Sequence, residues 1–173
     1  ENGPDLDVVA EAGVTINTER GRSPISPYVY GSNQDLPEGN PWTVRRLGGN
    51  RLTGYNWENN YSNAGSDYRH HSDVFLLTNG NVPESEWDEP AAVMTDWHDE
   101  SLSIGAETIM TLQMAGYVAA DNNGTVTESG TAPSDRWHEV VFEKEGELQT
   151  SPDESDNAVY MDELVHTLTE EYG

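Results

Sequence analysis

Residues 46–60 hold the densest group of side chains able to bind a sugar. The segment combines four asparagines, two arginines, one tyrosine, one tryptophan, one glutamate and three glycines. Asparagine and arginine offer directional hydrogen-bonding groups to hydroxyls, aromatic rings offer flat apolar faces to pyranose C–H groups, and glycine lets the backbone approach a ligand closely. This composition predicts a sugar-binding loop. A polar loop without a ligand is the alternative, because asparagine and glycine also favour turns.

A second group of candidate ligands is acidic. Glu58 stands beside two asparagines, and Asp153 and Asp156 lie in a later acidic segment. Calcium takes six to eight oxygen ligands, so these carboxylates are candidates for a structural calcium site. The alternative is a solvated acidic face in which Asp153 or Ser155 caps a helix. The sequence has no cysteine, which excludes disulfides and thiolate metal sites.

Hydrophobic periodicity predicts the helices and strands that would position these side chains. Helical spacing predicts one helix from Pro90 to Gly105 and a second that carries Met161, Leu164 and Leu168 and stops at Gly173. Alternation and β-branched residues predict strands at residues 14–17, 28–30, 43–47, 108–114 and 137–142. Long polar loops follow residue 47 and residue 114.

This order of strand, long loop and helix, repeated, predicts an α/β fold. In a (β/α)₈ barrel the loops at the carboxyl ends of the strands form the active-site face. Two such repeats cannot close a barrel, and a parallel sheet needs cover on both faces. The sequence therefore predicts roughly a quarter of a (β/α)₈ barrel.

The charge balance limits the kinds of partner that the protein can bind. Among 173 residues there are 32 acidic and eight basic ones, a net charge of −24, and Lys144 is the only lysine. We expect neither nucleic acid nor an anionic membrane as a partner. Acidic residues spread along a chain with almost no lysine are typical of a halophilic protein, whose charges repel less at high salt. An acidic secreted protein from an ordinary habitat is the alternative.

Three stretches, ISPYVYGSNQD (25–35), RLGGNRLTGYNWENNYSNAGSDY (46–68) and HHSD (70–73), resemble the N-terminal part of glycoside hydrolase family 44. Members of this family are endoglucanases and xyloglucanases that act on β-1,4-glucan chains. The resemblance implies that residues 1–40 supply strands of a β-sandwich domain, and that residues 41–173 form the first two β/α repeats of the catalytic barrel. The remaining C-terminal part of the enzyme would be a partner of this chain.

The resemblance also implies roles for particular residues. Family 44 enzymes hydrolyse with retention, through two glutamates whose motifs do not occur in this sequence, so the catalytic residues are expected outside this chain. By position, Asn50 and Arg51 would hydrogen-bond substrate hydroxyls, and Trp57 and Tyr68 would offer stacking faces. Arg51 could equally form a structural ion pair with a carboxylate. Family members bind calcium, which strengthens the expectation of a site at Glu58, Asp153 and Asp156.

Two other functions remain open at this point: a noncatalytic glucan-binding module and a structural calcium-binding domain. The predicted helices disfavour a binding module, which should be a closed β-sandwich. We expect the protein to be secreted, and residues 1–7 carry no leader, so any signal would already have been removed. Glycosylation sequons begin at Asn60 and Asn123.

Overall fold

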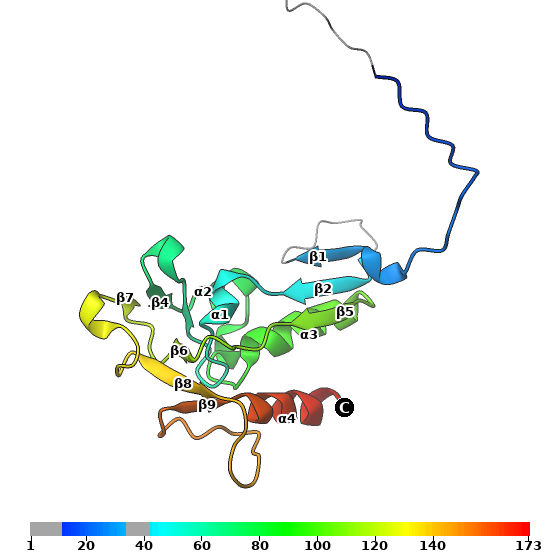
Figure 1. Ribbon diagram of the computed structural model, residues 1–173. Coiled ribbons are helices and arrows are strands. Elements are labelled where there is room, and N and C mark those ends of the chain that lie inside the picture. The colour runs from blue at the N-terminus through cyan, green and yellow to red at the C-terminus, as the bar shows by residue number, and fades with distance from the viewer. Residues whose placement is uncertain (1–11, 34–41) are drawn as a thin grey trace, which may run out of the picture.

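The computed structural model describes residues 12–33 and 42–173 (Figure 1). Its parallel sheet has the strand order β1-β2-β5, with β1 at Gly31–Asn33, β2 at Val44–Leu47 and β5 at Glu107–Met110. Helix α3 (Ala92–Ser103) joins β2 to β5 and packs on one face of this sheet. The unit is a β/α/β crossover, as parallel pairing requires.

The side chains of β2 alternate between the two faces of the sheet. Arg45 and Leu47 are buried on the side of α3, and Arg46 is exposed on the other side. The Arg45 guanidinium donates to the Glu100 carboxylate at 2.6 Å and lies 3.9 Å from the ring centroid of Trp97. These contacts with α3 let an arginine occupy a buried position that usually takes an apolar side chain.

Two smaller sheets are built from the loops that follow β2 and β5. The antiparallel order β3-β4-β7 joins strands from both loops, and β6-β8-β9 lies beside it in the second loop. The strands are β3 (Ser62–Asn63), β4 (His71–Asp73), β6 (Tyr117–Ala119), β7 (Gly124–Thr125), β8 (Trp137–Val141) and β9 (Ala158–Tyr160).

Short helices fill the remaining connections, and α4 closes the chain. The α-helices are α1 (Asn50–Thr53), α2 (Phe75–Gly80) and α4 (Met161–Tyr172). The 3₁₀ helices are η1 (Pro27–Val29), η2 (Ser66–Tyr68), η3 (Glu84–Glu86) and η4 (Glu128–Gly130).

One core runs beneath both loops and includes polar groups. Trp57, Met94 and Leu164 are fully buried in it. Asn60 is also fully buried and has a positive φ of 61°. Its side chain accepts from the Tyr55 hydroxyl at 2.6 Å and donates to two main-chain carbonyls, those of Trp87 (3.0 Å) and Glu89 (2.7 Å). All the hydrogen-bonding capacity of its amide nitrogen is therefore used inside the protein.

The long periodic elements were predicted correctly. The structure confirms the strands near residues 43–47 and 137–142 and both long helices, and the strand predicted at 108–114 runs from Glu107 to Met110. The strand predicted at 28–30 is wrong, because Pro27 and the acceptor Ser26 start the 3₁₀ helix η1 there. The strand predicted at 14–17 is not formed, and Val14 and Ile16 are exposed.

The α/β class is confirmed by this architecture. Strand β1 pairs with β2, so Gly31–Asn33 belongs to the parallel sheet, although the domain boundary was predicted at residue 40. Residues 1–11 and 34–41, which the sandwich and leader predictions include, lie outside the described residues. None of the described helices has the length and apolar character needed to cross a lipid bilayer.

Candidate substrate-binding site

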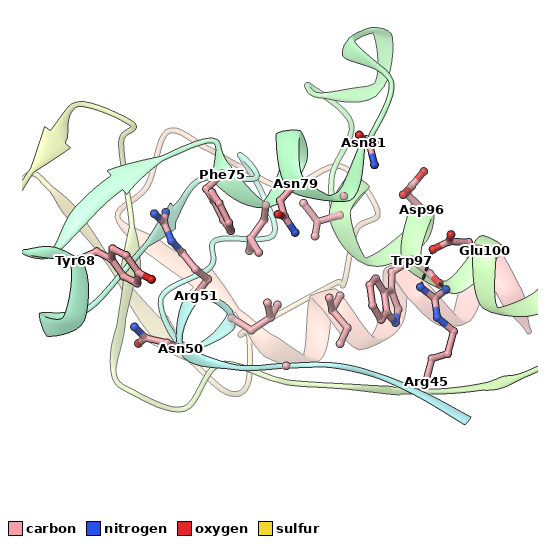
Figure 2. Close-up of a pocket in the computed structure, with 16 residues that line it drawn as sticks. Arg45, Asn50, Arg51, Tyr68, Phe75, Asn79, Asn81, Asp96, Trp97 and Glu100 are labelled. Atoms are coloured by element: carbon pink, nitrogen blue, oxygen red, sulfur yellow. Dashed lines mark hydrogen bonds and ion pairs between the residues drawn. The ribbon is translucent and has the colours of Figure 1, made fainter. Parts of the chain in front are cut away.

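A cavity of about 560 Å³ opens beside the carboxyl end of β2 (Figure 2). Apolar side chains, among them Leu47, Leu52 and Leu76, form part of its lining. One end holds Arg45, Trp97 and Glu100, and the other end holds Asn50, Arg51, Tyr68 and Phe75. Only the second end follows directly on a strand end and combines amide, guanidinium and aromatic groups, which is the chemistry that a sugar needs.

Asn50 is the first residue of α1 and is exposed at this end of the cavity. Its amide nitrogen donates to the carbonyl of Ala64. Gly65 makes this approach possible, because a Cβ at that position would lie 2.7 Å from the Asn50 Oδ1. The φ of Gly65, +65°, independently favours glycine. The loop from β2 is thereby attached to the loop that carries Tyr68.

Arg51 takes the structural role that the sequence left open. Its guanidinium forms a bidentate ion pair with Asp73, and Nη1 also reaches the carbonyl and hydroxyl of Ser62 at 3.3 Å. The guanidinium carbon lies 4.7 Å from the ring centroid of Phe75. Arg51 therefore fixes the strands β3 and β4 to α1. Its side chain also lines the cavity, in a position fixed by these contacts.

Tyr68 is more exposed than Phe75, the other ring at this end of the cavity. It ends the helix η2, and 71% of it is accessible. An exposed ring beside Asn50 and Arg51 can stack on a pyranose while its hydroxyl stays in water (Figure 2).

Trp57, predicted as a second stacking face, is not part of the site. Its side chain is completely buried in the core, and its indole N–H donates to the carbonyl of Tyr160 at 3.2 Å. A ring with no accessible face cannot contact a polysaccharide. The prediction was wrong because indole rings serve cores as readily as binding surfaces, and the sequence did not distinguish the two roles.

Glu58 is a buried carboxyl group with unusual ionisation. Only 2% of the residue is accessible, and its pKa is raised to about 8, first by burial and then by the negative charge of Asp156, Glu163 and Glu154. The nearby Lys144 opposes this shift but pairs directly with Glu163 at 2.6 Å. Oε2 of Glu58 is buried without a hydrogen-bond partner among the described residues.

Of the predicted calcium ligands, the structure brings Asp156 near Glu58 and leaves Asp153 aside. Asp156 is half-buried and accepts from the amide of Ala158 at 2.8 Å. Asp153 is exposed and accepts from the amide of Ser155 at 3.0 Å. Helix α4 starts at Met161, so neither Asp153 nor Ser155 caps it. Within residues 12–33 and 42–173, no three acidic or histidine side chains converge as metal ligands.

Sequence reasoning missed Asp73, the partner of Arg51. The residue precedes α2, where its carboxylate also accepts from the amide of Phe75 at 2.9 Å. A signal was present, since an aspartate two residues before an apolar Phe75-Leu76-Leu77 run is typical of a helix start. Its pairing with Arg51 joins residues 22 positions apart in the sequence, which local spacing does not reveal.

The site places this chain among α/β proteins whose ligand-binding loops follow the carboxyl ends of parallel strands. The family model described as glycoside hydrolase family 44 matches residues 61–173. Endoglucanase A of Paenibacillus lautus is 57% identical over 159 residues, which are 92% of this chain and 23% of that protein. The β-mannanase/endoglucanase A of Caldicellulosiruptor saccharolyticus is 54% identical, over 92% of this chain and 12% of its own length.

Solved structures agree with the sequence matches. A Paenibacillus polymyxa family 44 xyloglucanase with xyloglucan superposes on this chain with a TM-score of 0.85 and is 56% identical in sequence. A family 44 endoglucanase from Clostridium thermocellum superposes with a TM-score of 0.84 and is also 56% identical. Each match covers 87% of this chain and 30% of the solved chain. The chain belongs to glycoside hydrolase family 44. It spans less than a quarter of the length of these curated relatives.

Proposed function

We propose that this chain is part of a retaining endo-β-1,4-glucanase and supplies substrate-binding loops to it. Support comes from the names of its relatives, which are endoglucanases and a xyloglucanase. The observation that carries the proposal is the loop after β2, which presents Tyr68, Asn50 and Arg51 together at one end of the cavity. The two catalytic carboxyl groups come from parts of the enzyme outside this chain.

The finer architecture is part of the same proposal. Strands β1, β2 and β5 form one wall of a (β/α)₈ barrel, with α3 and α4 on its outside, and the segment before η1 contributes to a β-sandwich. The parallel pairing of three strands and the crossover through α3 support the barrel. Exposure of Val14, Ile16 and Ile25 supports a segment that packs on another part of the enzyme. Because glucan polymers do not enter cells, we also propose that the enzyme is secreted.

The function is tested with the intact enzyme at high salt on carboxymethylcellulose, xyloglucan and mannan. Release of reducing ends from a β-1,4-glucan, together with a rapid fall in viscosity, is the expected result for an endo-acting enzyme. Absence of glucan hydrolysis by a folded enzyme would reject the proposal. Hydrolysis of mannan alone would move the substrate class to that named for the Caldicellulosiruptor relative.

Replacement of Tyr68 tests the binding role directly. Tyr68→Ala should raise KM for cello-oligosaccharides about tenfold, because loss of a stacking ring costs on the order of 1 kcal/mol or more. Tyr68→Trp should keep or lower KM, since a larger face covers more of the pyranose. Tyr28→Ala serves as the control, because Tyr28 is similarly exposed but lies outside the cavity. Equal KM values for Tyr68→Ala and wild type would remove the ring from the site.

We further propose that Glu58 and Asp156 hold a structural calcium ion. The fit is favourable: Glu58 has a buried oxygen without a partner among the described residues, and three further carboxylates surround it. A bound divalent cation would compensate this excess of negative charge. Backbone carbonyls, amide oxygens or water would complete the coordination, because carboxylates alone do not form a metal-binding cluster in the described chain.

Glu58→Gln should change stability in opposite directions with and without calcium. In a chelator the folded pKa of Glu58, about 8, exceeds its unfolded value of 4.5, so the group's contribution to stability is complete below about pH 4.5. That contribution is lost as the pH rises through 8. The variant, which stays neutral, should therefore be more stable than wild type at pH 9, by roughly 2 kcal/mol, and about equal to it at pH 4.5.

Calcium at a hundredfold excess over Kd should stabilise wild type by about 2.7 kcal/mol and leave Glu58→Gln nearly unchanged. Urea unfolding of the intact enzyme at both pH values measures each difference. Glu84→Gln is the control, because Glu84 is exposed in the 3₁₀ helix η3. If calcium stabilised Glu58→Gln as much as it stabilises wild type, Glu58 would be excluded as a ligand.

A further inference from the structure

The face of the β1-β2-β5 sheet that turns away from α3 carries an arginine near its carboxyl end. Arg46 is the last residue but one of β2 and lies in register between Asn33 on β1 and Ile109 on β5. All three residues are exposed in this chain. Their neighbours on the opposite face turn toward α3, where the Thr108 hydroxyl lies 2.9 Å from the His98 Nδ1.

The Arg46 side chain is held in a defined position on this open face. Its Nη1 donates to the Oδ1 of Asn33 at 2.9 Å. The guanidinium also lies against Gly48, where a Cβ would be 2.5 Å from the Arg46 Cζ. Gly48 does not have a left-handed φ, so backbone conformation does not require glycine there. A Cβ at this position would instead displace the guanidinium.

Arg46 differs from four other basic residues of the described chain, which are paired with carboxylates. Arg45, Arg51, Arg136 and Lys144 each form an ion pair, with Glu100, Asp73, Asp121 and Glu163 respectively. Among the described residues no carboxylate lies within ion-pair distance of Arg46, although the chain has 32 acidic residues for eight basic ones. Any carboxylate partner of Arg46 therefore lies outside the described residues.

We propose that Arg46 is a positioning residue of the active site, which pairs with the nucleophile carboxylate and keeps it ionised. This inference rests on the proposed function. A barrel would enclose the open face, and an enclosed guanidinium requires an anionic partner. The carboxyl ends of barrel strands, where Arg46 lies, surround the reacting groups.

The retaining mechanism indicates which of the two catalytic carboxyl groups pairs with Arg46. An adjacent guanidinium lowers the pKa of a carboxyl group by about 1–3 units. The nucleophile must be ionised, so such a neighbour helps it. The acid/base group must begin the reaction protonated, so the same neighbour would hinder it. Arg46 therefore suits the nucleophile.

The test is the pH dependence of kcat/KM for the intact enzyme with an aryl cellobioside, whose acidic limb reports the nucleophile. In Arg46→Gln we expect the acidic limb to move up by about 1–2 pH units, kcat to fall about 100-fold and KM to change by less than about threefold. Arg46→Lys keeps the positive charge, so its acidic limb should lie between those of wild type and Arg46→Gln. Arg22→Gln changes an exposed arginine that forms no ion pair with the described residues; it is the control and should match wild type.

Gly48→Ala supplies a second variant if Arg46→Gln does not fold. It keeps the arginine but displaces its guanidinium, so its acidic limb should move in the same direction by a smaller amount. An unchanged acidic limb in the folded variants, with an active wild type, would overturn the role of Arg46 and leave the proposed function intact. A folded wild type that hydrolyses no glucan would overturn both.

Discussion

Transfer of the intact enzyme from about 3 M to about 0.1 M NaCl should lower its Tm by at least about 10 °C. The chain carries 32 acidic and eight basic residues, and four of the basic ones are already consumed in ion pairs within the fold. Most surface carboxylates therefore have no cation to neutralise them. At about 0.1 M salt the screening length is about 10 Å, so neighbouring carboxylates repel one another, whereas at molar salt it is about 3 Å.

A variant with fewer charges separates this repulsion from the general effect of salt on proteins. Glu143, Glu145 and Glu147 are exposed in the loop between β8 and β9. Changing all three to glutamine should raise the Tm at low salt and leave it unchanged at about 3 M, where screening already removes the repulsion. Thermal scans over a salt series give both values. A Tm that stays flat or falls as salt increases would reject the halophilic interpretation.

Trp57→Ala should destabilise the enzyme by about 3–5 kcal/mol, because it leaves a large cavity in the core. Trp57→Phe should cost less, about 1–3 kcal/mol, since a phenyl ring fills part of the space but leaves the Tyr160 carbonyl without its donor. Urea unfolding measures both losses. For enzyme that remains folded, KM should equal that of wild type, because the indole contacts no solvent. Normal stability combined with a raised KM would return Trp57 to the substrate site.

The sequence predicted those parts of the fold whose periodicity is long enough to be specific. Helix α4, with Met161 and Leu164 buried on one stripe, and strand β2 were found from pattern alone. Helix α1 was missed because four residues show no period, and β9 because Ala158–Tyr160 runs directly into α4. Alternation at residues 14–17 did not make a strand, since a strand also needs a partner for its hydrogen bonds.

The candidate site was predicted in composition more than in arrangement. Asn50, Arg51 and Tyr68 line one cavity, because they follow one strand end in sequence, and their contact with a glucan stays a prediction. The partner Asp73 and the roles of Trp57 and Arg46 depend on which way each side chain points, and that is decided by long-range packing. The resemblance to family 44 supplied candidate roles, and burial then separated core from surface.

The enclosure of Asn60 restricts how this protein can be produced. Asn60-Tyr61-Ser62 is a sequon, and a eukaryotic secretory host attaches glycans to such asparagines while the chain is still unfolded. A glycan there would replace one of the two N–H groups that donate to the Trp87 and Glu89 carbonyls, and it could not fit in a fully buried position. Glycosylated molecules would fail to fold, whereas a glycan on the exposed Asn123 would do no harm. Prokaryotic expression without N-glycosylation avoids this loss.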